Sequence, residues 1–551
     1  MSALPHLRGL LPRRSDYAEL SRSWRADLMA GLTVGIVALP LALGFGISSG
    51  AGAEAGIVTA VVAGFVAAVF GGSHIQVSGP TGAMVVVLAP IVAAHGIGAV
   101  ALLSLMAGLI LLITGIARMG RAVALIPWPV IEGFTLGIAA IIFLQQVPAL
   151  TGAEGELSTN VIVAALQSVT RLELDYALWA LLCVAIVVAC MLGLPRIHRS
   201  IPASLVGIIV ATTVTTLAGA PLAVIGELPH SLPAPVLPSV SLGLLGELAL
   251  PALTVAALAG IESLLSVRVA ASMSSKGRYE ADRELVGQGL ASIGAGLFGG
   301  MPATGAIART AVNLRAGART RVAAGFHSVV LLAIILFAAA PVGMVPLAAL
   351  AGVLMMTALR MVQRRTAMSI LRSTKPDALA FVVTAVVTIS VDLIFAVIIG
   401  VVVAGFFAVR SLARAAGVRR EELPGEPVDG DDKIALLRIK GPLMFAAADR
   451  VSEAVTGQQG VSVVILAMSQ LQVVDATGAH TLGEMVTALE RRGVTVLIKG
   501  VLPSHKGLFE RLGVMKALRH QKHLFPHLAP ALEHARSHVA RERDAAMAVS
   551  R

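Results

Sequence analysis

Two apolar stretches of the sequence are interrupted by closely similar segments that contain Pro and Gly. The first reads GFVAAVFGG and then GPTGAM at 79–84, and the second reads GAGLFGG and then MPATGAI at 301–307. A helix that restarts after such a break, here at Thr81 and at Thr304, presents unpaired N–H groups and the positive end of its dipole. Two such ends that face each other form an anion site without a charged side chain. Kinked packing helices with small contact residues are the alternative, but two breaks at matching places favour a binding site.

Two ionisable residues lie in apolar surroundings near the second break. Glu262 stands in LTVAALAGIESLLSV, where a charge at mid-membrane costs roughly 2.5–3.5 kcal/mol, so we expect a proton carrier or a Na⁺ ligand. A structural hydrogen-bonding acid is the alternative. Arg309 follows Thr304 by a little over one helical turn, which places a positive charge near the anion. There are two alternatives. Arg309 could be a snorkelling residue at the end of a short helix, or it could pair directly with Glu262.

Other kinds of chemistry are not indicated. The sequence has no pattern of a catalytic triad, a metal cluster or a nucleotide-binding loop, so we expect no enzyme, no cofactor and no metal beyond a coupling ion, H⁺ or Na⁺. The formal net charge of +11 suggests nucleic acid, but aromatic residues make up only 4% and are not interleaved with the basic ones. Nucleic acid is therefore not an expected partner.

The elements that hold these residues are predicted to be membrane-spanning helices. The chain is 56% hydrophobic and 14% charged, and a run of about 20 apolar residues crosses the hydrocarbon core. We predict an α-helical polytopic membrane protein with about fourteen spans. They are placed near 26–46, 53–71, 76–94, 98–117, 124–147, 176–194, 201–219, 248–268, 285–299, 303–314, 322–340, 344–359, 376–390 and 392–410.

Lys and Arg collect in alternate loops. They occur at 13–25, 118–121, 196–199, 268–283, 315–321 and 360–375 and are absent from 48–54, 93–97, 219–247, 299–302 and 340–346. The remaining outside loop, 148–175, has a single basic residue, Arg171. By the positive-inside rule this pattern predicts a multi-pass protein of the cell (inner) membrane with both termini in the cytoplasm.

The two breaks lie in corresponding spans of two seven-span halves, 26–219 and 248–410. Seven is odd, so the halves enter the membrane in opposite orientation, as an inverted repeat. Residues 1–25 are predicted to be a cytoplasmic segment and 411–432 a linker. Strand-like and helical runs alternate in 433–540, which predicts a small α/β domain.

The sequence is similar to the SulP (sulfate permease) family of anion transporters. The similarity covers nearly the whole chain, from AGLTVGIVALPLALGFGISSGAGAEAG through GPTGAM and FGGMPATGAIARTAVNLRAGART to the last domain, which resembles STAS. The resemblance implies core and gate domains, elevator-like alternating access, a homodimer, and a small anion bound between the third and tenth helices. It implies sulfate or bicarbonate as cargo, with C4-dicarboxylates as an alternative. An anion-responsive sensor or scaffold that signals to a cytoplasmic partner through STAS is an alternative of another class.

The resemblance also assigns residues. The first half-helix is matched by Thr81, Gly82 and Ala83, the second by Gly305 and Ala306, and the family's Arg near the anion by Arg309. Glu262 stands where Na⁺-coupled bicarbonate transporters have Asp, and Ile307 where they have Thr. In the STAS-like domain, Asp475-Ala476-Thr477-Gly478 stands where relatives carry a phosphorylated serine, so Thr477 is a candidate phosphate acceptor, or a loop and helix-cap residue.

Overall fold

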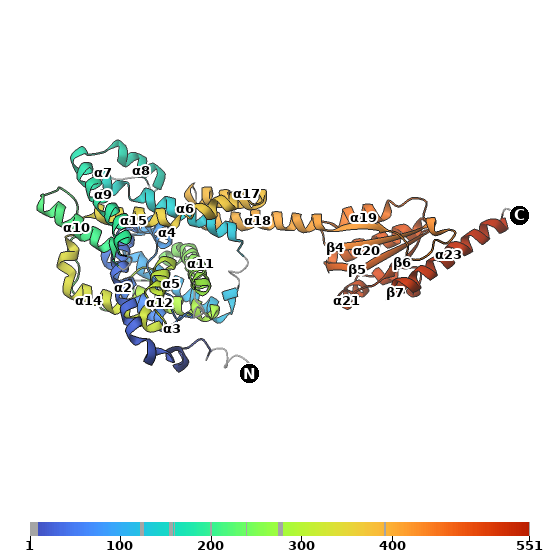
Figure 1. The fold of residues 1–551 in the computed structure, drawn as a ribbon, viewed down its shortest axis with the longest axis horizontal. Coiled ribbons are helices and arrows are strands. Elements are labelled where there is room, and N and C mark those ends of the chain that lie inside the picture. The colour runs from blue at the N-terminus through green and yellow to red at the C-terminus, as the bar shows by residue number, and fades with distance from the viewer. Residues whose placement is uncertain are drawn as a thin grey trace. The chain divides into compact units, whose positions relative to one another are not determined.

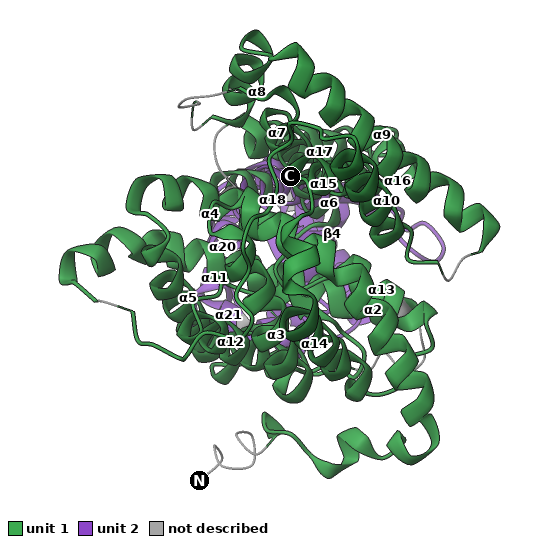
Figure 2. Ribbon diagram, turned by 90° about the vertical axis from the view of Figure 1, so that its left-hand side faces the viewer, with its two compact units in different colours: residues 1–401 green, residues 402–551 purple. Residues whose placement is uncertain are grey.

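The chain folds into two compact units, Met1–Val401 and Val402–Arg551 (Figures 1 and 2). The computed structural model describes residues 9–121, 126–153, 158, 160–198, 201–238, 240–273, 279–390 and 393–549. Residues 274–278, inside one of the predicted basic loops, lie outside the described residues.

Fourteen of the described helices coincide with the fourteen predicted spans. In the first half they are α2 (Leu20–Ser48), α3 (Gly52–Phe70), α4 (Gly82–His95), α5 (Gly98–Ile116), α6 (Trp128–Gln145), α9 (Leu174–Ile197) and α10 (Ala203–Leu217). In the second half they are α11 (Leu242–Met273), α12 (Ala281–Leu297), α13 (Ile307–Arg315), α14 (Arg321–Gly343), α15 (Leu347–Met361), α17 (Lys375–Ser390) and α18 (Leu393–Ala415).

Nine helices among the described residues are long and apolar enough to cross a membrane. The helices α4 and α13 are much shorter because each begins only after a Pro- and Gly-containing break. The connections carry three further short helices, α7 (Pro148–Thr151), α8 (Val161–Thr170) and α16 (Arg364–Leu371).

Helix packing in this unit follows the inverted repeat. The second helix of each half packs against the fourth helix of the other half, α12 on α5 and α3 on α14. The first helices do the same, α11 on α5 and α2 on α14, and the fifth and sixth helices cross-pack as α6 on α17 and α15 on α9. Two groups result, a core group of α2–α5 and α11–α14 and a gate group built around α6, α9, α10, α15 and α17 (Figure 2). The helix α18 joins the gate group at Gly400, which lies against Thr384 of α17 and Val130 of α6.

The N-terminal segment is anchored to the core group by a buried ion pair. A short 3-10 turn at Arg14–Tyr17 places Asp16, which is 7% exposed, 2.6 Å from Arg283 and 3.6 Å from Arg321. Both arginines are 2% exposed. Both were predicted to lie in basic loops, but they are buried, and Asp16 supplies the carboxylate partner that a buried guanidinium needs.

The second unit is an α/β domain with a five-stranded sheet of order β3-β4-β5-β6-β7, as the alternating runs predicted. Its strands are β3 (Gly417–Glu421), β4 (Ile434–Leu443), β5 (Val463–Val474), β6 (Thr495–Lys499) and β7 (Leu524–Phe525). All neighbours pair in parallel except β3, which is antiparallel to β4. The segment 411–432, predicted as a linker, therefore contributes an edge strand.

Both faces of this sheet are covered by helices. On one face, residues such as Leu437 and Leu466 pack with α19 (Ala448–Thr456), α20 (Ala476–Arg491), α21 (Pro503–Arg511) and α22 (Val514–Ala517). On the other face, Leu436 and Ile465 pack against Ala531 and Ala535 of α23 (Leu528–Val549). A mostly parallel sheet buried on both sides explains the continuous apolar runs of its strands.

Candidate functional site

The two breaks lie side by side in the core group. The residues before α4 form the short strand β1 (Ser78–Gly79), which pairs antiparallel with β2 (Thr304–Gly305) before α13. The backbone N–H of Ala306 extends this contact by donating to the carbonyl of Val77 at 2.8 Å. The starts of α4 and α13 are thereby brought together from opposite halves of the sequence.

The first helix restarts where the sequence predicts and the second does not. Thr81 is extended, with φ −132° and ψ 163°, and directly precedes α4, so Gly82 and Ala83 supply its first unpaired N–H groups. In the other half Thr304 belongs to β2, and α13 begins only at Ile307. The expected start at Thr304 is wrong because this residue pairs with the first break, and its hydroxyl donates to the carbonyl of Ala259 at 3.0 Å.

Glycine at 305 is required by close packing. A Cβ atom at this position would lie 1.4 Å from Nε2 of Gln76 and 3.0 Å from Oγ of Ser263. Gln76 Nε2 itself donates to Ser263 Oγ at 2.9 Å. The second break can therefore approach α11 and the first break only without a side chain at Gly305.

Glu262 and Arg309 lie on either side of the first break. The hydroxyl of Thr81 donates to Oε2 of Glu262, in α11, at 2.9 Å. Arg309, 2% exposed, donates from Nη2 to the carbonyl of Pro80 at 2.7 Å, and its Nη1 is buried without a hydrogen-bond partner among the described residues. Both side chains are described, and no ion pair joins them within 4.0 Å. Glu262 is instead bonded to Thr81, and Arg309 to the preceding residue, Pro80.

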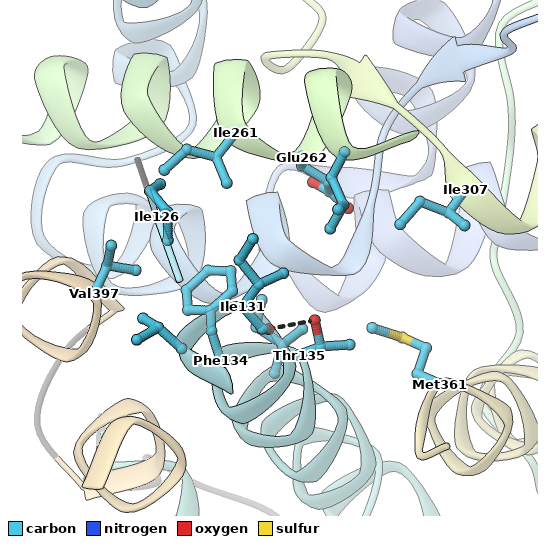
Figure 3. Close-up of a pocket in the computed structure, with 12 residues that line it drawn as sticks. Ile126, Ile131, Phe134, Thr135, Ile261, Glu262, Ile307, Met361 and Val397 are labelled. Atoms are coloured by element: carbon cyan, nitrogen blue, oxygen red, sulfur yellow. Dashed lines mark hydrogen bonds between the residues drawn. The ribbon is translucent and has the colours of Figure 1, made fainter. Parts of the chain in front are cut away.

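A small pocket lies between the core and gate groups beside Glu262 (Figure 3). Its volume is about 60 Å³, which has room for a few water-sized groups at roughly 10–15 Å³ each. Among the described residues that line it, Glu262 is the only charged one, and the hydroxyl of Thr135 donates to the carbonyl of Ile131 at 2.8 Å. The walls are Ile126, Val130, Ile131, Phe134, Thr135 and Ile138 at α6, Ile261, Glu262 and Leu265 in α11, Ile307 in α13, Met361 in α15 and Val397 in α18.

Of the residues predicted from the sequence for transport, only Glu262 lines this pocket. The other predicted residues are not among those that line it. Thr81 reaches it through the hydrogen bond to Glu262, and Ala306 directly precedes the lining residue Ile307. The guanidinium of Arg309 faces the backbone of the first break.

A buried polar network behind the site was not expected from the sequence. Glu284 of α12 accepts hydrogen bonds from Ser263 at 2.6 Å and from Gln288 at 2.9 Å, and Gln288 also donates to Ser78 of β1 at 2.6 Å. The network ties β1 to the residue next to Glu262. The signal in the sequence is the Glu and Gln four residues apart in RELVGQGLASIG, one helical turn in a segment otherwise rich in small residues.

In the second unit, Thr477 is exposed in the first turn of α20. The cap of this helix is Asp475, whose carboxylate accepts from the N–H of Gly478 at 2.7 Å and from that of Phe445 at 3.1 Å. Asp475 therefore fills the cap role that was considered for Thr477, and the hydroxyl of Thr477 is left accessible.

The sequence matches the family model described as the sulfate permease family over residues 24–384 and that of the STAS domain over residues 427–531. YvdB of Bacillus subtilis, a protein assigned to sulfate transport, is 33% identical over 515 residues, which cover 92% of this chain and 97% of YvdB. The bicarbonate transporter BicA of Synechocystis is 30% identical over 518 residues, which cover 90% of this chain and 91% of BicA.

Two solved structures resemble this one. The transmembrane domain of a cyanobacterial BicA superimposes with a TM-score of 0.61 at 32% identity, over 70% of this chain and 97% of that one. The murine anion transporter Slc26a9, solved in an inward-facing state, superimposes with a TM-score of 0.83 over 97% of this chain and 95% of that one. At 18% identity, the second likeness concerns the fold alone.

Proposed function

The chain belongs to the sulfate permease family, and we propose that it carries a small anion, sulfate or bicarbonate, across the cell membrane by secondary-active transport. The observation that carries this proposal is the hydrogen bond from Thr81 to Glu262. This bond connects Glu262, an ionisable side chain in a pocket, to Thr81, the residue directly before the half-helix α4. A coupling ion bound at Glu262 and an anion bound at the start of α4 would therefore be neighbours.

The anion is proposed to bind at the paired breaks. The free N–H groups at the start of α4, from Gly82 and Ala83, and those at the start of α13, beyond Gly305 and Ala306, offer hydrogen bonds and positive dipole ends. Arg309 adds a full positive charge in a buried position. The size of the neighbouring pocket, about 60 Å³, supports a small anion as the cargo.

We propose H⁺ as the coupling ion in preference to Na⁺. A Na⁺ ion needs several oxygen ligands, and the described residues that line the pocket offer few, because only Glu262 and Thr135 among them have a side-chain oxygen. A carboxyl group needs only a proton to become neutral in an apolar pocket. The alternative, Na⁺ coupling, predicts that a Na⁺ gradient instead of an H⁺ gradient drives anion uptake.

Movement of the core group against the gate group is the proposed transport step. The pocket is lined from both groups, and its gate-side walls are apolar except for Thr135, whose hydroxyl donates to the carbonyl of Ile131 in its own helix. Sliding along such a surface separates few polar contacts, which suits an elevator-like motion. Both termini are proposed to lie in the cytoplasm, where the STAS domain would meet a soluble partner, and the family resemblance supports a homodimer.

Uptake into proteoliposomes tests the proposal. Labelled sulfate, bicarbonate, chloride and fumarate are offered under an imposed H⁺ or Na⁺ gradient to the wild type, to Glu262→Gln and to Glu132→Gln. The control residue Glu132 also lies in a membrane helix, but it bonds to Trp128 at 3.1 Å and does not line the pocket.

We expect an H⁺ gradient to drive accumulation of sulfate or bicarbonate by the wild type and by Glu132→Gln but not by Glu262→Gln. Accumulation by Glu262→Gln at the wild-type level contradicts the coupling role. Preferred uptake of fumarate would identify a C4-dicarboxylate transporter. Tight anion binding without any flux would identify a sensor that acts through the STAS domain.

A further inference from the structure

Three histidines of the second unit converge at one end of its sheet. His534 and His538 lie one helical turn apart on α23, and His523 ends the 3-10 turn Gln521–His523 directly before β7. Their ring centroids are 5.4 Å apart for His523 and His534, 5.6 Å for His523 and His538, and 4.9 Å for His534 and His538. One ring nitrogen from each lies within 4.8 Å of the other two.

Two rings of this cluster each have a buried nitrogen that the fold leaves without a partner among the described residues. His523 is 2% exposed, and its Nδ1 has no hydrogen-bond partner among the described residues; the same holds for the buried Nε2 of His534. A buried ring nitrogen without a partner costs free energy, and a cation would remove that cost. His538 is half-buried, so the cluster is open to solvent on one side.

From this geometry we propose that His523, His534 and His538 bind a divalent late transition metal, Zn²⁺ in the first place. Three neutral imidazoles suit Zn²⁺, Ni²⁺ or Cu²⁺, whereas Mg²⁺ and Ca²⁺ require oxygen ligands. Two histidines one turn apart on a helix, with a third from another segment, leave a fourth position of the tetrahedron for water or for the exposed His520, whose ring lies 5.6 Å from that of His523.

The geometry requires a modest closure. Two nitrogens bound at about 2.0–2.1 Å to the same tetrahedral ion are about 3.3 Å apart, so the rings must approach by roughly 1 Å. Rotation of the half-exposed His534 and His538 can supply it.

The positive surroundings limit the affinity. The positive charges of Arg519 and Arg541 lie close enough to His538 to repel a cation bound there. Three neutral ligands also leave both positive charges of the ion uncompensated. We therefore expect moderate affinity. No metal site was expected from the sequence. The signal that was passed over is the HARSH pattern at 534–538, two histidines four residues apart.

A bound ion would join the turn before β7 to α23, the helix that covers one face of the sheet. The consequence is a more stable second unit. This role is independent of the proposed transport chemistry, because no residue of the cluster belongs to the site at the two breaks.

Metal titration of the full chain tests the proposal. The protein is purified in detergent with an affinity tag that contains no histidine, stripped with a chelator, and titrated calorimetrically with Zn²⁺, with Co²⁺ as a spectroscopic probe and Mg²⁺ as the negative probe. The variants are His534→Ala/His538→Ala and, as a matched control, His527→Ala, an exposed histidine of the same segment outside the cluster.

We expect one Zn²⁺ per chain, a tetrahedral Co²⁺ spectrum and a higher unfolding temperature with Zn²⁺ for the wild type and His527→Ala. In the double variant Zn²⁺ affinity should fall by at least about 100-fold, since even loss of an outer-shell partner costs 10- to 100-fold. Equal affinity in the wild type and the double variant, or Zn²⁺ binding no stronger than Mg²⁺ binding, overturns the proposal. His534→Gln/His538→Gln, which keeps polar side chains, should lose the ion without unfolding.

Discussion

A single methyl group added at Gly305 should separate the two breaks. In Gly305→Ala the new Cβ would lie 1.4 Å from Gln76 Nε2, a distance that no pair of non-bonded atoms can hold. The amide of Gln76, which is 6% exposed, must therefore turn away from Ser263 while it stays buried. Because Gly305 pairs with Ser78, the displacement also affects the strand contact that brings α4 and α13 together.

The size of this effect follows from two contributions. Loss of a buried hydrogen bond that leaves its partner unsatisfied costs about 1–3 kcal/mol. Overpacking of a dense interior by one methyl group costs about 1–3 kcal/mol. We expect Gly305→Ala to lower the free energy of unfolding of the membrane unit by about 2–6 kcal/mol and to abolish anion uptake.

The assay compares apparent unfolding temperatures of detergent-purified variants and their uptake in proteoliposomes. Gly246→Ala is the matched control, because this glycine lies in α11 and a Cβ there meets nothing within 4 Å. The decisive variant is Gly305→Ala combined with Gln76→Ala, which removes the clashing amide. In that background we expect the added methyl group to cost less than about 1.5 kcal/mol, the remainder reflecting the contact with Ser263.

Two results would refute this reasoning. One is a Gly305→Ala protein that unfolds at the wild-type temperature and transports normally. The other is a cost that stays the same when Gln76 is truncated, since the two substitutions would then act independently.

Three further predictions concern the charged and polar residues around this framework. Arg309→Met should weaken anion binding about 10- to 150-fold, equivalent to roughly 1.5–3 kcal/mol for a lost charge-assisted contact; a calorimetric titration with unchanged affinity would show that the anion does not use this charge. Asp16→Asn should destabilise the protein by about 3–5 kcal/mol, because Arg283 stays buried without its carboxylate. Burial raises the pKa of Asp16, but hydrogen bonds from Arg283 and from the backbone outweigh it and lower the pKa to about 2. The stabilisation should thus be present above about pH 4 and disappear toward pH 2 in thermal unfolding of the wild type, and Asp16→Asn should lack this change. In the second unit, Asp475→Ala should lower stability by about 1–2 kcal/mol because it removes a helix cap, whereas Thr477→Val should change stability by less than about 0.5 kcal/mol. Hydrogen exchange of α20 measures both changes. Equal effects of the two substitutions would contradict the assignment of the cap to Asp475.

The helical architecture was predictable because its signals are local. Apolar runs and the positions of Pro and Gly predict the spans, the two breaks and the odd number of helices in each half without any knowledge of contacts. The edge strand β3 was not predictable in this way. Its sequence, GVRRE, is charged and follows a long helix, and it becomes a strand only because β4 offers an unpaired edge.

The site shows the same division between local and long-range information. The start of α4 after Thr81 follows from the local sequence, and so does the unusual position of Glu262 in an apolar helix. The later start of α13 depends on pairing with residues more than 200 positions earlier. Whether Glu262 and Arg309 pair with each other depends on which groups the fold brings next to them, and these are Thr81 and the carbonyl of Pro80.

That separate placement of the two charges is consistent with the proposed transport cycle. A direct ion pair between Glu262 and Arg309 would neutralise both and leave neither free for a coupling ion or an anion. Here the acid bonds to the Thr81 hydroxyl and the arginine to the carbonyl of the residue before it. Protonation of Glu262 would remove a negative charge from the start of α4, where negative charge repels an arriving anion. In the proposed mechanism, proton binding therefore favours anion binding through electrostatics alone, and by linkage anion binding favours the proton to the same extent.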